Sequence, residues 1–390
     1  MLLNNLINTS NGRTIHISVN QGHIESVGEK IPARDHFVLH FRKAVAIPGL
    51  INSHDHLDFN CFQPLGTNTY NNYTEWGKEI HHIFRNHIQA VLNIPQNLRT
   101  AWGLYKNLIS GVTTVVHHGP FIPIENPPIH VFQDTQNLHS TAFEKNWKWK
   151  LNNPFLKRRM VVIHAGEGTD LRSKNEIDDL IKYNLSGRNI VGIHGVAMKS
   201  SQAKKLKALI WCPESNQLLL DKQPDIKELK KNIRIVLGTD STLTGNWDFW
   251  HHLRFARSLQ ITGSEELFDM CTRIPAALWG MNRGEIKPGK EADIVILKSK
   301  PYAEIGELVF QSGPEDILLV IQQGKIRLFD DCLLPQLRNR IALDGYSKMT
   351  IRNSVKFVEG DLPALADKIK SFHPHMVFPV HFREKIMEVR

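Results

Sequence analysis

The chain has 390 residues, of which 41% are hydrophobic and 22% charged, so it is long enough for a large catalytic domain with a smaller unit attached. Its four cysteines lack a Cys-x-x-Cys spacing, which argues against a disulfide framework or a cysteine-based zinc knuckle and favours a reducing compartment. The first residues lack the basic region of a signal peptide, and no apolar run approaches the roughly 18 residues of a membrane span. We therefore expect a cytoplasmic protein.

The formal net charge of +9 comes partly from basic segments at 145–150, 156–160 and 204–207. A basic chain can bind nucleic acid, but these segments are dispersed, which is more typical of solvated surface. We therefore expect a small-molecule substrate, and neither nucleic acid nor membrane as a partner.

Short strands separated by turns are predicted in the first 45 residues, at 14–19, 24–27 and 37–41. From about residue 46 to 280, apolar strand-like runs alternate with helical stretches, which is typical of a parallel α/β architecture. Short strands return at 293–297 and 317–322. We infer that the two ends of the chain build one sheet module beside the α/β part.

The strands of the α/β part are short and rich in β-branched residues, at 112–116, 160–164, 189–194, 209–212 and 233–238. Ser173 and Glu176 have the spacing of a capping box, which predicts a helix start there. Cys212 is expected to pack within its strand and not to bind metal. The tail offers strand candidates at 354–358 and 376–382 and a helix at 362–372, and no role is assigned to it.

His54 and His56 are the first candidate metal ligands. Residues two apart in a strand point the same way, so the two imidazoles share a face while Asp55 points away. Neighbouring neutral imidazoles suit a borderline metal such as zinc. On this fragment alone, two ordinary polar residues at a strand end remain an alternative.

Three further polar side chains end predicted strands, namely His164, His194 and Asp240. In a barrel of parallel strands the carboxyl ends meet around one axis, where such enzymes keep their active sites. Three histidines and one carboxylate, with room for water, form a catalytic coordination set. The strand ends therefore predict a metal-dependent hydrolytic centre.

Six segments together resemble the amidohydrolase superfamily, in its cytosine deaminase and chlorohydrolase-like branch. They are PGLINSHDH at 48–56, HAGE at 164–167, GIHG at 192–195, CPESN at 212–216, LGTDS at 237–241 and GKEADIVIL at 289–297. The resemblance covers roughly residues 1–330. It implies a distorted (β/α)8 TIM-type barrel at 47–283, a composite β-sandwich from 1–46 and 284–332, and hydrolysis at a carbon bearing nitrogen or halide. The segment 333–390 is left as a C-terminal appendage of unknown role, and a homodimer is a guess from family habit.

The resemblance also implies roles for single residues. His54 and His56 match the ligands of the first strand, His164 that of the fifth, and Asp240 the residue after the eighth. Glu167 matches the proton shuttle of the deaminases. His194 matches a histidine that contacts substrate or bound water, and a second metal ligand or a polar plug remains its alternative. None of the lysines between His118 and His164 lies in an apolar strand that would aim it inward to bridge two metals, so we expect one divalent ion, with zinc favoured over iron.

The predicted function is thus an aminohydrolase that acts on a small heterocyclic or guanidine-like substrate. The alternatives are an amide, urea or carbon–halogen hydrolase, or a non-catalytic scaffold. In the predicted mechanism, Asp240 positions the attacking water, Glu167 donates a proton to the leaving group, and His194 orients the substrate.

Several residues are candidates for the substrate pocket. Trp76, with Tyr70 and Tyr73, follows the first barrel strand and could form an aromatic wall or lid, with core packing as the alternative. Either His117 or His118, at the end of the second strand, could line the pocket, and His118 is our candidate. The stretch from His118 to His164 is short for two complete βα units, so one unit could be abridged.

Overall fold

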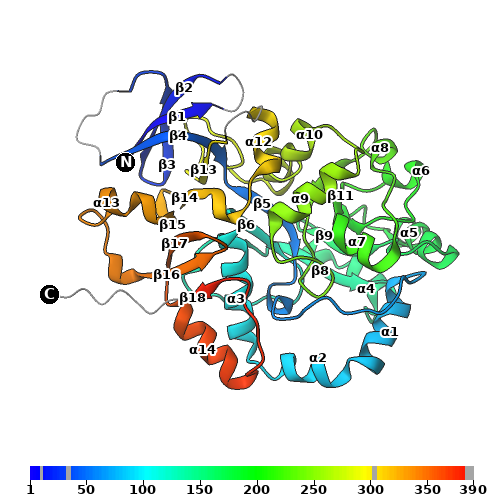
Figure 1. The fold of residues 1–390 in the computed structure, drawn as a ribbon. Helices are drawn as coiled ribbons and strands as arrows, with labels where there is room; N and C mark the ends of the chain where they lie inside the picture. The colour runs from blue at the N-terminus through cyan, green and yellow to red at the C-terminus, as the bar shows by residue number, and fades with distance from the viewer. Residues whose placement is uncertain (9–11, 32–36, 301–304, 383–390) are drawn as a thin grey trace.

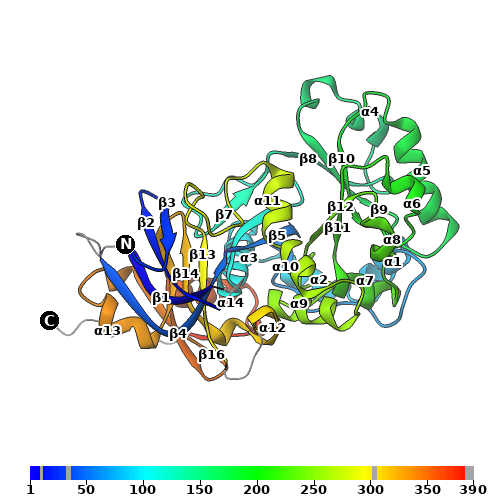
Figure 2. The same ribbon diagram turned by 90° about the horizontal axis from the view of Figure 1, so that it is seen from above.

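The structure is a computed structural model that describes residues 1–8, 12–31, 37–300 and 305–382. A part built of parallel strands and helices lies beside a large mixed sheet to which both ends of the chain contribute (Figures 1 and 2). The fold is therefore α/β with an additional sheet unit, as the sequence predicted. Among the described helices, none has the length and apolar character needed to cross a bilayer.

The parallel strands form two sheets, with the orders β12-β11-β10-β9-β8 and β5-β6-β7. An isolated parallel bridge between Asp55 and Asp240 joins the end of β5 to the chain that follows β12. The carboxyl ends of the two sheets consequently approach each other. The strands are β5 (Leu50–Asp55), β6 (Val112–His117), β7 (His130–Phe132), β8 (Thr135–Ser140), β9 (Met160–Ala165), β10 (Ile190–His194), β11 (Ala208–Trp211) and β12 (Arg234–Leu237).

Strands β7 and β8 are separated by only Gln133 and Asp134, which leaves no room for a helix between them. Strand β7 pairs with β6, whereas β8 pairs with β9. The Asn137 side chain in β8 also donates to the carbonyls of His117 (3.3 Å) and Gly119 (2.9 Å), beyond the end of β6. One nearly continuous extended segment thus lies between β6 and β9. Both strands between His118 and His164 are present, but the helix that would join β7 to β8 is missing, so one βα unit is abridged, as the length of the stretch suggested.

Helices cover the parallel strands and join them to the mixed sheet. Each longer helix buries one apolar face, because its apolar residues recur at helical spacing. They are α1 (Tyr73–Ile83), α2 (Arg85–Leu92), α3 (Gln96–Ile109), α4 (Trp147–Leu151), α5 (Leu171–Tyr183), α6 (Ser200–Ala203), α7 (Pro213–Leu220), α8 (Ile226–Leu229), α9 (Phe249–Ser258), α10 (Ser264–Asp269), α11 (Arg273–Trp279), α12 (Ile305–Gln311), α13 (Leu334–Leu337) and α14 (Leu362–Phe372).

The start of α5 differs from the prediction. Asp170 is the N-cap, and its carboxylate accepts a hydrogen bond from the backbone N–H of Ser173 at 2.9 Å. The prediction of a capping box at Ser173 and Glu176 is therefore wrong. The competing acceptor three residues earlier satisfies the first turn, which leaves Glu176 free for contacts outside the helix.

The mixed sheet has ten strands in the order β18-β16-β17-β15-β14-β13-β4-β1-β2-β3. Its hydrogen bonding makes it one continuous sheet rather than two separate ones. The strands are β1 (Leu2–Asn8), β2 (Thr14–Asn20), β3 (His23–Gly28), β4 (Val38–Pro48), β13 (Ile294–Lys298), β14 (Ile317–Gln322), β15 (Lys325–Asp330), β16 (Tyr346–Ile351), β17 (Ser354–Glu359) and β18 (His381–Phe382).

Alternation along β13 shows how this sheet is held between two cores. Ile294 and Ile296 pack with the terminal strands, whereas Val295 and Leu297 belong to the core shared with the parallel strands. Because successive side chains point to opposite faces, a continuous apolar run buries both faces of the strand. The sheet is thereby fixed against the part that carries the strand ends.

The tail extends the same sheet. Strand β17 pairs with β15 and β16, β18 pairs with β16, and α14 packs against α3. The helix predicted at 362–372 has those bounds, whereas the strand predicted at 376–382 is ordered as a strand only over its last two residues. Residues 383–390 of the predicted appendage lie outside the described residues. The predicted domain boundaries remain a prediction.

Candidate metal centre

Four side chains from three strand ends converge at one point. They are His54 on β5, His56 just after it, His164 on β9 and Asp240 after β12, and one potential ligand atom of each lies within 4.8 Å of the others. The Nε2 atoms of His54 and His56 lie 3.4 and 3.5 Å from Oδ1 of Asp240. The structure thus brings together the four residues that the sequence predicted as ligands.

Hydrogen bonds to residues outside the candidate ligand set orient these side chains. Nδ1 of His164 lies 2.7 Å from the carbonyl oxygen of His139, so it donates there and leaves Nε2 with a free lone pair. Oδ2 of Asp240 accepts from the hydroxyls of Ser215 (2.9 Å) and Thr244 (2.8 Å), while Oδ1 faces the imidazoles. Such outer partners fix the direction of metal ligands in proteins.

The electrostatics favour neutral imidazoles beside an ionised carboxylate. Burial lowers the pKa of His54 to about 4, and burial together with neighbouring imidazoles lowers the pKa of His164 well below its usual value. Burial acts to raise the pKa of Asp240, but the His54 ring 3.4 Å away and the other nearby imidazoles outweigh burial and hold that pKa well below the usual range. Neutral imidazoles and a carboxylate are the forms that bind a divalent metal.

The backbone is specialised at the same strand ends. His194 and Asp240 both adopt left-handed conformations, with φ of 68° and 61°. Such conformations are unfavourable for residues with a side chain and concentrate at functional sites. At Gly238 an added Cβ would lie 2.7 Å from Cβ of His54, so glycine is needed for the close approach of the chain after β12 to β5.

Asp55 points away from the metal centre, as strand alternation predicted, into a fully buried polar network. Its carboxylate accepts hydrogen bonds from Lys106 (2.8 Å), Asn107 (2.8 Å), Asn60 (2.7 Å) and Asn52 (3.1 Å). The ion pair with Lys106 on α3 compensates two buried charges. The network ties the strand that carries His54 and His56 to a helix.

Glu167 and His194 lie next to the candidate ligands. Burial, with Asp240 and Glu176 nearby, raises the pKa of Glu167 well above its usual value. Nδ1 of His194 lies 2.8 Å from Oδ1 of Asn216, whereas Nε2 has no hydrogen-bond partner and is 3.6 Å from Oε1 of Glu167. Asn216 belongs to the CPESN segment, but its role as the residue that orients His194 was not predicted.

His56, His164, Glu167 and Asp240 line a cavity of about 1160 Å³. Trp76 and His118, predicted as pocket residues, both line it, and the ring of His118 lies 4.8 Å from that of His164. His139 also lines it, which the sequence did not indicate because β8 is short and irregular. Apolar side chains complete one wall, among them Phe59, Phe62, Ile80, Phe143 and Leu243. Tyr70 instead packs with Leu219 and Leu220.

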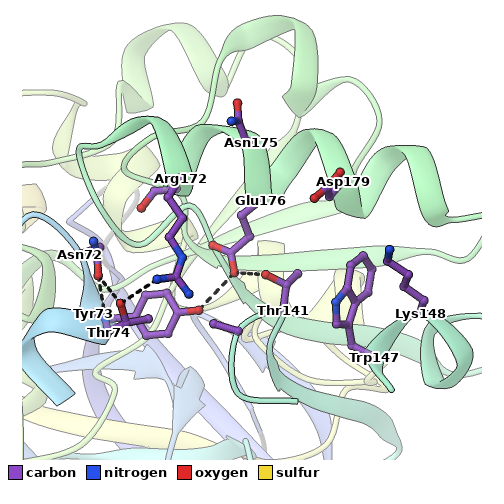
Figure 3. Close-up of a pocket in the computed structure, with 12 residues that line it drawn as sticks. Asn72, Tyr73, Thr74, Thr141, Trp147, Lys148, Arg172, Asn175, Glu176 and Asp179 are labelled. Carbon is purple, nitrogen blue, oxygen red and sulfur yellow. Dashed lines mark hydrogen bonds between the residues drawn. The ribbon is translucent and has the colours of Figure 1, made fainter. Parts of the chain in front are cut away.

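A second, polar pocket of about 530 Å³ lies on the other side of Tyr73, which lines both spaces. Figure 3 shows Glu176 pointing down between Tyr73 and Thr141, whose hydroxyls donate to it at 3.3 and 2.7 Å. The second oxygen of Glu176 accepts from the backbone N–H of Gly166 at 3.1 Å. Glu176 therefore holds the turn immediately before Glu167.

Comparison with known proteins finds a family domain in the part of the chain that carries most of this site. The amidohydrolase family matches residues 157–327, which include His164, Glu167, His194 and Asp240. The chain carries an amidohydrolase domain. The match covers less than half of the chain, and this amidohydrolase domain, together with the His/Asp cluster, fits a metal-dependent hydrolase of carbon–nitrogen bonds.

Relatives of this amidohydrolase include the 5-methylthioadenosine/S-adenosylhomocysteine deaminase of Pyrococcus furiosus, which is 23% identical over 85% of this chain and 95% of its own. Several other deaminases match over less than half of their length. Among solved structures, a zinc-bound adenosine deaminase from Xanthomonas campestris superposes with a TM-score of 0.73 at 15% identity, over 96% of this chain and 98% of its own. A triazine hydrolase variant gives a TM-score of 0.72 at 15% identity, over 95% and 98%.

Proposed function

We propose that the amidohydrolase is a zinc-dependent deaminase that removes an exocyclic amino group from a purine nucleoside or a similar substituted heterocycle. The observation that carries this proposal is the convergence of His54, His56, His164 and Asp240 beside a buried Glu167, at the bottom of one large cavity. A binding protein without turnover would not require the acid to be held next to the ligand set.

The four residues fit a divalent metal. Both ring nitrogens of His54 are buried and have no hydrogen-bond partner among the residues that the structure describes, which is costly unless a bound group satisfies one of them. Three imidazoles and one carboxylate match the donor preference of zinc and keep a position free for water. When bound, the metal supplies a water whose pKa is lowered to about 7.

Side chains of the protein carry out the proton transfers and orient the substrate. Asp240, anchored through Oδ2, orients the water and accepts its proton on Oδ1. Burial raises the pKa of Glu167, which favours its protonated form, and Glu167 donates a proton to the ring nitrogen. His194 presents Nε2 to the substrate while Asn216 fixes its ring. The water oxygen bonds to the carbon that carries the amino group, and the carbon–nitrogen bond then breaks. The leaving nitrogen takes the proton held by Asp240 and departs as ammonia, while the remaining hydroxyl proton returns to Glu167.

The size and lining of the cavity favour a substrate larger than a bare base. Its volume of about 1160 Å³ exceeds the roughly 300–1,000 Å³ of typical small-molecule pockets. An apolar wall that includes Phe59, Phe62 and Trp76 suits a substituent attached to the heterocycle. The nucleoside deaminases among the relatives make a nucleoside the first candidate.

A triazine is the second candidate, because a triazine hydrolase has a closely similar fold. A carbon–halogen bond would not need a proton from Glu167, since halide leaves as an anion. Dependence on Glu167 therefore separates the two chemistries.

The strand arrangement supports a closed, distorted barrel around this centre. One seam is the bridge between Asp55 and Asp240, and the other is the segment formed by β7 and β8. Closure places the carboxyl ends of all these strands around one axis.

Ammonia release tests the proposal. Purified protein is stripped of metal, reloaded with zinc or iron(II), and assayed with adenosine, 5′-methylthioadenosine, guanine and aminotriazines. We expect zinc-restored ammonia release, largest for a nucleoside, and about one metal per chain. Halide release without ammonia from chlorotriazines would favour the second candidate, and no metal retained after reloading would contradict both.

A further inference from the structure

Residues 147–159 form a fixed surface platform whose backbone is held from below by Arg188. This side chain is almost fully buried, with 3% exposure. Its guanidinium donates to four backbone carbonyls of the platform and to one side-chain amide: Leu151 (3.0 Å), Asn153 (3.3 Å), Leu156 (2.6 Å), Arg159 (2.9 Å) and Gln136 (2.9 Å). The conformation of this segment is therefore imposed by the core.

Large apolar side chains project from the platform into solvent. Phe155 is 93% exposed and Trp149 is 69% exposed, and Leu185, in the turn that Asn152 contacts, is 81% exposed. Leu185 is held close because Asn152 bonds to the backbone of Tyr183 (2.8 Å) and of Ser186 (2.9 Å). Single exposed apolar residues are ordinary, but a held cluster of them marks an interaction surface.

Cations surround these apolar side chains. Residues 145–159 contain six lysines and arginines and no acid. Lys157 and Arg158 are exposed and make no ion pair within the described residues. They line a concavity of about 400 Å³ beside Phe155, together with Arg159 and with Asp134, whose carboxylate pairs with Arg159 at 2.8 Å. Two of the three basic segments that looked dispersed in the sequence, 145–150 and 156–160, thus lie in one surface around α4 and the start of β9.

This surface lies away from the metal centre. The platform leads into the amino end of β9, whereas His164 lies near the carboxyl end of the same strand. Figures 1 and 2 both place α4 and α5 at the end of the molecule opposite the mixed sheet. Binding here would leave the cavity open to its substrate.

We propose that this platform docks on an anionic lipid bilayer. Trp and Phe side chains flanked by Lys and Arg are the pattern of proteins that lie on a membrane interface: the apolar groups enter the headgroup region while the cations meet anionic headgroups. In the concavity beside Phe155, Arg159 is paired with Asp134, and Lys157 and Arg158 are the cations that can meet one such headgroup.

Other occupants fit less well. A second copy across a two-fold axis would bring the uncompensated cations of two platforms together, which is unfavourable. Single-stranded nucleic acid stacks its bases on aromatic rings and pairs phosphates with cations, but it gives no use to the projecting aliphatic Leu185. Hydrocarbon accommodates aromatic and aliphatic side chains alike.

Vesicle flotation with the full, zinc-loaded chain tests the proposal. We expect binding to vesicles of phosphatidylcholine with 30% phosphatidylglycerol, weaker binding at high salt, and little binding to pure phosphatidylcholine. Trp149→Ala/Phe155→Ala should weaken binding at least about tenfold, and Lys157→Glu/Arg158→Glu should do the same. These positions are exposed, so unfolding temperature and ammonia release should stay unchanged.

The matched control is Lys204→Glu/Lys205→Glu, which makes the same change in net charge at exposed positions near α6. Equal loss of binding in this control would show diffuse electrostatic attraction and overturn the proposal. So would unchanged binding by the platform variants, or no vesicle binding by the wild-type chain. Tighter binding of a single-stranded RNA oligonucleotide than of the anionic vesicles would assign the surface to nucleic acid instead.

Discussion

The carboxyl ends of the parallel strands and the mixed sheet are both built from fully buried strand residues, but these residues are stabilised in different ways. In β13 every residue from Ile294 to Leu297 is apolar and fully buried, so packing alone holds the strand. In β5 the residues from Asn52 to Asp55 are equally buried but polar. They are tolerable only because each is hydrogen-bonded or faces the metal centre.

This contrast predicts two classes of substitution. Changes at the strand ends should remove chemistry or leave a buried charge uncompensated, whereas changes in the mixed sheet should lower stability without altering the reaction. Any substitution in the sheet that changed catalysis of folded protein would break the separation.

The largest effect is expected from His164→Ala. Losing an outer partner of a metal ligand costs roughly 10–100-fold in affinity or activity, and losing a ligand itself should cost more. We expect metal and activity to disappear together, as measured by elemental analysis and ammonia release on one preparation. His82→Ala, at an exposed position on α1, is the control and should keep both. Full metal occupancy in His164→Ala would remove this residue from the ligand set.

The next largest effect is expected from Glu167→Gln. Glutamine keeps the shape of the side chain but cannot exchange a proton. Because acid–base steps contribute about 10²–10⁴-fold, kcat should fall by at least about 100-fold while metal content and KM change little. Retained metal with near-normal turnover would contradict the shuttle role, and loss of metal would instead make Glu167 a support for the ligand set.

Much of this site was predictable because the chemistry follows strand ends. The apolar runs before His164, His194 and Asp240 predicted where β9, β10 and β12 end to within a few residues. The capping of α5 by Asp170 was not predictable, because several side chains near a helix start can accept its first hydrogen bonds and their spacing alone does not rank them. Strand β1 was missed because Asn4 and Asn5 interrupt its apolar pattern.

Contacts between residues that lie far apart in the chain could not be predicted from the sequence either. Lys106 lies 51 positions from Asp55 in the chain, and nothing in α3 distinguishes it from a solvated lysine. His139 contacts His164 through a backbone carbonyl, which any residue type could supply. Such pairings depend on how the abridged barrel packs, and local periodicity carries no information on that.

Lys106→Met tests the buried polar network around Asp55 at the end of β5. It removes the cation that compensates Asp55, where both side chains are almost fully buried. An unpaired buried charge costs about 3–5 kcal/mol, so the free energy of unfolding should fall by that amount in urea denaturation. Lys231→Met breaks an exposed ion pair with Glu228 and should change stability little. Equal stability of the two variants would mean that Asn52, Asn60 and Asn107 suffice for Asp55.

The smallest effect on catalysis is expected from Ile296→Ala in β13. Its side chain is fully buried in the core of the terminal strands, away from the cavity. Removing it leaves a cavity and should lower the free energy of unfolding by about 2–5 kcal/mol, whereas Ile296→Val should cost about 0.5–1.5 kcal/mol. Because Val295 and Leu297 still pack against the parallel strands, the positions of His54 and Asp240 should not change. Urea denaturation tests the stability of the variants, and ammonia release per folded molecule tests their catalysis. We expect reduced stability with wild-type kcat. A kcat that falls in step with stability would show that the sheet positions the metal centre.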